Sequence, residues 1–138
     1  MKYLILCSLL LLSLVPLSCS QNQETCEWRE VAKFQADYDY ISSTYSKQQE
    51  PFSVTGGKFR LQWVAGRPAE YAQGVTYFSI AVYQYPDMKL VESPVDEKDV
   101  GEEATAHEVE VQAGKGMYCL YISCGESVVW VVNVDECV

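Results

Sequence analysis

The sequence predicts an all-β protein: a small antiparallel β-sandwich of the jelly-roll type, with about seven or eight strands, behind an N-terminal signal peptide. Three observations predict this fold. Apolar and polar residues alternate from residue 52 onward, and short alternating segments recur at intervals of about 8 to 15 residues. Turn residues separate these segments, and no helical repeat of apolar residues runs through them.

The first twenty residues have the pattern of an export signal. Lys2 precedes an apolar run from about residue 4 to residue 15, and small residues follow at positions 18 to 20. The run is shorter than the roughly 20 apolar residues that a membrane-spanning helix needs. The expected organisation is a signal peptide over 1–20, a short polar tether over 21–25 and a β-sandwich domain over 26–138.

The end of the signal, Leu17-Ser18-Cys19-Ser20, allows two cleavage sites. A cut before Gln21 would release a secreted chain. A cut before Cys19 resembles a bacterial lipobox, in which the cysteine becomes the lipid-bearing N-terminus, although Pro16 departs from that pattern. We therefore expect either a lipoprotein of the cell envelope or a secreted protein. Contact with a membrane is expected only through a lipid on Cys19.

The chain is acidic, with 10 Lys and Arg against 19 Asp and Glu and a net charge of −9. Removal of the signal takes Lys2 away, and 9 cations against 19 acids leave a charge of −10. Because binding to nucleic acid depends on Lys and Arg that displace counterions, nucleic acid is excluded as a partner. The same charge disfavours anionic lipid surfaces.

Four cysteines follow the tether. In an exported chain an even number of cysteines indicates disulfides. Cys119 and Cys124 would lie about 16 Å apart in an extended strand, at ~3.3 Å per residue, so they can pair only if the chain turns between them. Cys26 begins the domain and Cys137 ends it, and antiparallel pairing of these ends favours the disulfide Cys26–Cys137. The pairing of the other two stays open. A zinc site of these cysteines and His107 is the competing interpretation, but no C-x-x-C pair is present.

The predicted strands place their apolar residues on one face. In 58–64, Phe59, Leu61 and Trp63 face one way and polar residues the other. Segment 75–84 has apolar or aromatic residues on both faces, so it is expected inside a sheet. Segment 27–34 fits either a helical turn or a strand. The predicted strands in order are 52–54, 58–64, 75–84, 88–91, 107–111, 117–123 and 128–134, with turns at 56–57, 86–87, 114–116 and 124–127.

Residues 92–103 are predicted to form an acidic loop. Asp96, Glu97 and Asp99 are weak candidates for a Ca²⁺ site, because carboxylate oxygens close in sequence are the ligands that Ca²⁺ prefers. The spaced D-x-D-x-D-G pattern is absent, so a solvated run of charge is favoured, with no metal and no cofactor.

The alternating core residues carry a resemblance to a known domain. The segments are Phe52-x-Val54-x-Gly56-Gly57-x-Phe59-Arg60-Leu61-x-Trp63, Phe78-x-Ile80-x-Val82-Tyr83, Gly116-x-Tyr118-x-Leu120-x-Ile122 and Trp130-x-Val132-x-Val134. Over about residues 26 to 137 the chain resembles a small β-sandwich domain of uncharacterised exported proteins and lipoproteins of bacteria and archaea. More distantly it is similar to bacterial pre-peptidase C-terminal domains. The resemblance implies accessory or binding duties and transfers no site.

These patterns favour a non-enzymatic binding or accessory module at the cell envelope. Tyrosines offer rigid apolar area with a hydroxyl, so Tyr38, Tyr40, Tyr45 and Tyr71 are candidate recognition residues for a protein or glycan partner. The alternatives are a small secreted hydrolase or enzyme inhibitor that uses His107, the only histidine, and a Ca²⁺-stabilised structural domain. No G-x-S-x-G motif surrounds a serine, so an enzyme is not expected.

Overall fold

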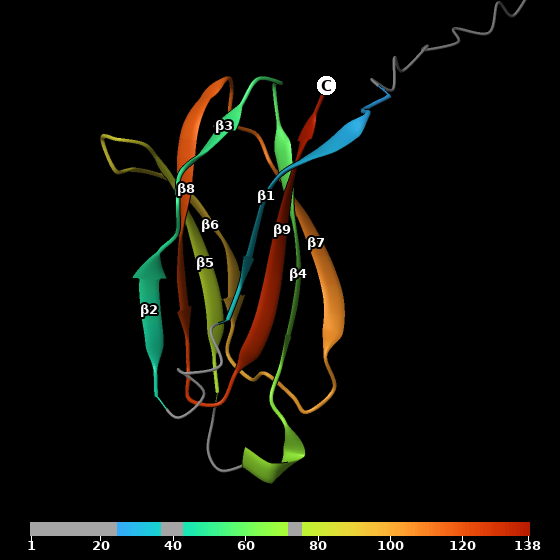
Figure 1. The fold of residues 1–138 in the computed structure, drawn as a ribbon, viewed down its shortest axis with the longest axis vertical. Coiled ribbons are helices and arrows are strands. Elements are labelled where there is room, and N and C mark those ends of the chain that lie inside the picture. Colours follow the sequence, from blue (N-terminus) through green and yellow to red (C-terminus); the bar gives the residue numbers. More distant parts are fainter. Residues whose placement is uncertain (1–24, 37–42, 72–75) are drawn as a thin grey trace, which may run out of the picture.

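The computed structural model describes residues 25–36, 43–71 and 76–138, which form two antiparallel β-sheets packed face to face (Figure 1). The predicted all-β sandwich is confirmed, with nine strands among these residues. The helical structure described is one short 3-10 helix, η2, at Ala69–Tyr71. None of the described residues form a helix that is long and apolar enough to cross a bilayer.

One sheet has four strands in the order β1-β9-β4-β7. Its two inner strands are β9 and β4, which pair along their whole length from Phe59↔Glu136 to Gly66↔Val129. The bounds of the four strands are Trp28–Gln35 for β1, Phe59–Gly66 for β4, Thr105–Val111 for β7 and Val129–Cys137 for β9.

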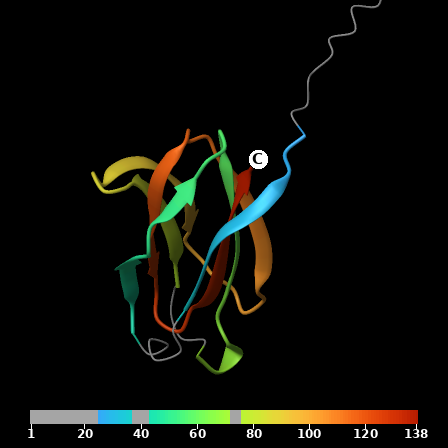
Figure 2. The ribbon, with the colours of Figure 1, turned by 45° about the horizontal axis from the view of Figure 1, so that its top comes forward.

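The other sheet has five strands. Its order is β2-β8-β5-β6, and β3 also pairs with β8, so β2 and β3 follow one another along the same edge of β8 (Figure 2). The strand β5 lies between β8 and β6, which confirms its predicted place inside a sheet. The bounds are Tyr45–Gln48 for β2, Phe52–Val54 for β3, Phe78–Gln84 for β5, Lys89–Glu97 for β6 and Gly116–Cys124 for β8.

The core lies between the two sheets and contains the residues that the alternation predicted to face inward. Phe59 packs at 5.5 Å from Phe52 and 5.4 Å from Tyr118, measured between ring centroids. Towards the other end, Trp130 lies 6.0 Å from Phe78. The side chains with no measurable exposure are Phe59, Leu61, Phe78, Ile80, Val82, Val111, Leu120, Ile122, Val132 and Val134, together with Cys119 outside the core.

The ambiguous segment 27–34 is a strand, β1. Its register against β9 shifts between Glu30 and Ala32, which marks a β-bulge at Val31. Because a bulge inserts one extra residue, side chains on either side of it lose their common face. This bulge explains why the spacing of apolar residues in 27–34 fits a helical turn as well as a strand.

One predicted boundary is wrong and one strand was missed. The predicted loop over 92–103 begins too early, since β6 continues through Pro94 to Glu97. Proline is tolerated there because β6 is an edge strand and Pro94 falls where the register with β5 shifts and gives it no partner. The strand β2 was not predicted, because Tyr45-Ser-Lys-Gln48 contains one large apolar residue and shows no alternation.

The two ends of the domain are held together by a group of contacts that we term the terminal clamp: the disulfide Cys26–Cys137 and the carboxylate of Glu136. The disulfide is the pair favoured from the sequence, with Cα atoms 5.0 Å apart, while Cys119 and Cys124 are free and buried. Glu136 is 1% exposed and pairs with Arg29. It also accepts hydrogen bonds from Thr55 N at 2.6 Å, Thr55 Oγ1 at 3.0 Å and Gly56 N at 3.2 Å.

Candidate functional site

Several residues singled out from the sequence lie outside the described part of the chain. They are the candidate lipidation site Cys19 and the tyrosines Tyr38 and Tyr40. Tyr71 is the last residue of η2, and its side chain is likewise outside the description. Their proposed roles therefore stay predictions.

Tyr45, the fourth candidate tyrosine, is half-buried at the start of β2. Its ring packs edge-on against Trp130, with 5.6 Å between ring centroids. Its hydroxyl accepts a hydrogen bond from Gln49 Nε2 at 2.9 Å. Tyr45 therefore closes one side of the core, and only part of its ring is available to a partner.

The three calcium candidates are not brought together. Asp96 is exposed on β6, where Lys98 Nζ lies 3.9 Å from its carboxylate, and Asp99 is exposed in the following loop. Glu97 turns towards Trp63 instead. Within the described residues, no three His, Cys, Asp or Glu side chains gather in a way that could hold a metal ion.

His107, the candidate acid or base, bridges the two sheets at the side where β6 and β7 are the edge strands. Its ring stacks on Trp63 with centroids 5.3 Å apart and planes at 20°. Glu97 Oε1 accepts a hydrogen bond from Trp63 Nε1 at 2.7 Å and lies 3.7 Å from His107 Nε2. These contacts connect β4, β6 and β7. His107 therefore helps to hold the two sheets together at this edge of the sandwich.

The outer face of the four-stranded sheet is charged over one half. Arg60 lies 2.8 Å from a carboxylate oxygen of Asp135 and 3.2 Å from one of Glu108. Its guanidinium also lies over the ring of Trp28, 4.5 Å from the centroid. Side chains of opposite charge pair across neighbouring strands, as expected for a sheet face that is exposed to solvent.

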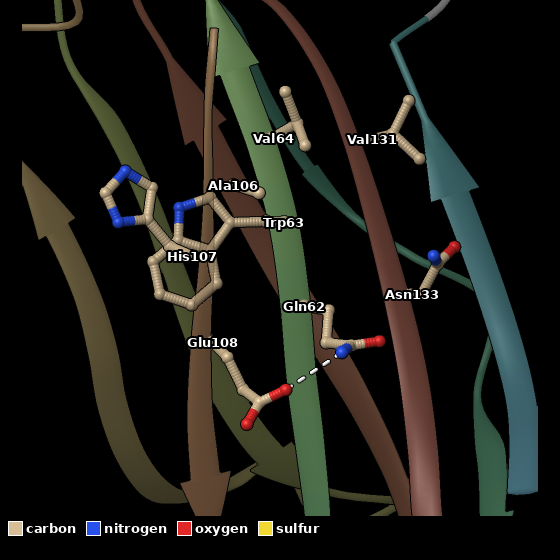
Figure 3. Close-up of a pocket in the computed structure, with 8 residues that line it drawn as sticks. All are labelled: Gln62, Trp63, Val64, Ala106, His107, Glu108, Val131 and Asn133. Atoms are coloured by element: carbon tan, nitrogen blue, oxygen red, sulfur yellow. Dashed lines mark hydrogen bonds between the residues drawn. The ribbon is translucent and has the colours of Figure 1, made fainter.

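Beyond these charges the same face is hollowed by a shallow depression of about 410 Å³ (Figure 3). Val64, Ala106 and Val131 supply its apolar lining. Gln62 donates to Glu108 at 2.8 Å across it. The buried Oδ1 of Asn133, which also lines the depression, has no hydrogen-bond partner among the described residues.

The outer face of the five-stranded sheet is different in kind. On its two inner strands, β8 and β5, inward core residues alternate with outward positions that carry no charged side chain. The pairs Ala81↔Tyr121 and Tyr83↔Leu90 place these side chains on one surface. We term it the tyrosine–methionine face; its members are Ala81, Tyr83, Leu90, Met117, Cys119 and Tyr121, with Met88 in the adjoining turn.

Large apolar side chains on this face are open to solvent. Leu90 is 53% exposed, Met117 39% and Tyr121 37%, although each lies in a strand. Tyr121 also accepts a hydrogen bond at its hydroxyl from Ser46 Oγ at 3.0 Å, which fixes its ring against the sheet. The result is a partly exposed apolar surface whose two inner strands carry no charged outward side chain.

This face was not among the candidate sites predicted from the sequence. The signal was present in segment 117–123, where the outward positions Met117, Cys119 and Tyr121 are as apolar as the inward ones. A strand that faces water on one side normally carries polar residues there. Which other strands contribute to the face depends on the order β8-β5-β6, which alternation does not reveal.

Comparisons with known proteins give only distant structural likenesses and no family for this chain. No family model matches the chain, and no curated protein matches it. Among solved structures, a protein from Sulfurospirillum deleyianum is similar over 75% of this chain and 95% of its own, with a TM-score of 0.40 and 11% identity. A chain in the structure of infectious bursal disease virus, Gx strain, is similar over 79% of this chain and 31% of its own, with a TM-score of 0.41 and 9% identity.

Proposed function

We propose that this protein is a non-enzymatic binding module, exported or tethered by a lipid on Cys19, that holds a protein partner at the cell envelope. The observation that carries the proposal is the tyrosine–methionine face, an uncharged apolar surface on the open side of the five-stranded sheet. Contiguous apolar surface of this kind marks sites of interaction on soluble domains.

The composition of the face favours a protein over other partners. The cores of protein interfaces are enriched in tyrosine and methionine and depleted in Lys, Glu and Asp, and the outward positions of β8 and β5 have that composition. A glycan would need several amide or carboxylate groups beside the aromatic rings to bind its hydroxyls. On the charged half of the other sheet, the basic and acidic side chains already pair with one another.

Site-specific photocrosslinking tests the partner and the face together. A photoreactive phenylalanine analogue replaces Tyr121 in the exported chain, and a matched control places it at Gln62 on the outer face of the other sheet. We expect a discrete crosslinked product from position 121 in intact cells and none from position 62. Crosslinking confined to position 62, or absent from position 121, would overturn the proposed face.

The tether is tested separately by Cys19→Ala. If Cys19 carries the lipid, the substituted protein leaves the membrane fraction, and the intact mass of the native protein exceeds that of the processed polypeptide by the lipid. A Cys19→Ala protein that stays in the membrane contradicts the anchor, while the binding face is judged by the crosslinking alone.

A glycan partner is the second candidate, favoured by one observation: the unpartnered Oδ1 of Asn133 beside Gln62 in the depression of Figure 3. A sugar hydroxyl could donate to that oxygen. Binding to a glycan panel that Asn133→Ala abolishes and Tyr121→Ser leaves unchanged would place recognition there.

A further inference from the structure

Three residues with sulfur side chains lie at one end of the tyrosine–methionine face, and two of them are in contact. Sγ of Cys119 lies 3.7 Å from Sδ of Met88. Met117 lies two residues before Cys119 on β8, and so projects from the same side of the strand. The chain has three methionines, of which Met1 belongs to the signal segment, so both methionines of the domain lie beside one free thiol.

The backbone brings the second methionine to the same place. Tyr85 N donates to the carbonyl oxygen of Met117 at 2.9 Å, which holds the turn between β5 and β6 against the start of β8. Met88 is in that turn, and its side chain reaches back over Cys119. The three sulfur-bearing residues thus come from two segments, the turn before β6 and the start of β8, which the pairing of β5 with β8 holds side by side.

The burial of the three residues differs in a way that suits a ligand site. Cys119 is buried but does not belong to the core cluster between the sheets, since it points to the outer face. Met88 and Met117 are 37% and 39% exposed. The thiol is therefore shielded by a thioether that solvent can reach.

The conformation of Met88 is unusual for its residue type. Its φ of 54° lies in the left-handed region, where hairpin turns favour Gly or Asn and a long side chain is uncommon. Such a conformation persists when other contacts hold it, and it is found at functional sites. The Met88 side chain contacts the thiol of Cys119.

We propose that Cys119, Met88 and Met117 form a binding site for a soft monovalent metal ion, Cu(I). Thiolate and thioether sulfur select Cu(I), whereas Ca²⁺ and Mg²⁺ take oxygen ligands. Binding breaks the S–H bond of Cys119, forms an S–Cu bond and releases one proton to solvent, with no change in oxidation state. One thiolate balances the single charge of the ion, so the bound site is neutral, and the charges next to it in sequence are those of Asp87 and Lys89 on either side of Met88. The site does not depend on the proposed partner.

The test uses the domain with its Cys26–Cys137 disulfide intact. Ascorbate keeps copper as Cu(I) under anaerobic conditions without the thiol reductants that would open the disulfide, and a coloured Cu(I) chelator competes for the ion. We expect one Cu(I) per chain and one proton released. Cys119→Ser should abolish the site. Met88→Leu and Met117→Leu, which conserve volume, should each weaken it by roughly tenfold or more.

Cys124→Ser is the matched control, because Cys124 is the other buried free thiol but faces the core. It should bind Cu(I) as the native protein does. The proposal fails if the native protein does not retain Cu(I) against the chelator, if Cys119→Ser still binds it, or if Cys124→Ser loses it. Should Cys119→Ser not fold, the double variant Met88→Leu/Met117→Leu decides, and an unchanged affinity overturns the site. Tighter binding of Zn²⁺ than of Cu(I) would overturn the class of metal.

Discussion

Replacing Glu136 by glutamine should destabilise the domain by about 3 kcal/mol at pH 7. Burial would by itself raise the pKa of this carboxyl, but the Arg29 guanidinium and the hydrogen bonds from Thr55 and Gly56 outweigh it and lower the pKa to about 2, from 4.5. Since one pKa unit corresponds to about 1.36 kcal/mol, the ionised form stabilises the fold by about 3 kcal/mol. Glutamine keeps an accepting oxygen and loses this charge.

The stabilisation by Glu136 should depend on pH in a definite direction. A carboxyl whose pKa is lowered on folding contributes stability above its unfolded pKa of about 4.5, and loses it as the pH falls towards 2. Glutamine does not titrate. The difference between native protein and variant should therefore be full at pH 7 and largely gone at pH 2. Because the Arg29 side chain is 59% exposed, salt should reduce part of the difference at pH 7 and leave the share due to the backbone N–H groups.

Urea unfolding at pH 7 and pH 2, with the disulfide intact, measures this. Glu110→Gln is the control, since that carboxylate also pairs with a cation, Lys58 at 3.0 Å, but is 44% exposed. Its loss should stay below about 1 kcal/mol. A loss for Glu136→Gln that is no larger than the control, or that is as large at pH 2 as at pH 7, would refute the reasoning.

Four further predictions concern the same domain. Gly56→Ala should cost more than about 3 kcal/mol in urea unfolding, because a Cβ there would overlap the carbonyl oxygen of Cys137, whereas Gly57→Ala, which points into open space, should cost under about 1 kcal/mol. Cys26→Ser should lower stability by about 4 to 5 kcal/mol in the loop-entropy account, and reduction of the native protein should lower its melting temperature similarly. Trp63→Phe should cost about 1 to 2 kcal/mol, because a carboxylate on β6 loses the indole N–H, and native-state hydrogen exchange should show faster opening of β6 and β7. A calcium chelator should leave the melting temperature unchanged, because the three weak Ca²⁺ candidates do not converge and no other such cluster forms among the described residues.

Alternation predicted the core because its signal is local. Phe59, Leu61 and Trp63 share a face by strand geometry alone, and they are buried whichever strands lie beside them. The bulge at Val31 and the polar edge strand β2 break that rule. In both segments, pairing with a strand far away in the sequence decides the structure. The sequence of one segment alone does not show which strand will pair with it.

The candidate sites were less predictable than the fold, for a related reason. The disulfide could be favoured because its cysteines stand at the two ends of the domain. The contact of Met88 with Cys119 joins residues 31 positions apart and depends on the pairing of β5 with β8, so neither residue is distinctive in the sequence. Glu97 illustrates the converse, since its place in an acidic run suggested a cation while the fold directs it to Trp63.

The terminal clamp also determines how a pulling force would be transmitted into the domain. Both ends of the domain emerge at one pole of the sandwich, where β1 begins beside the end of β9 (Figure 1). A pull applied upstream of Cys26 passes through the disulfide to Cys137 and loads β9, an inner strand paired on both sides, before it can peel the edge strand β1. A tethered copy would therefore resist shear at its attachment point, and the opposite pole would stand farthest from the anchor.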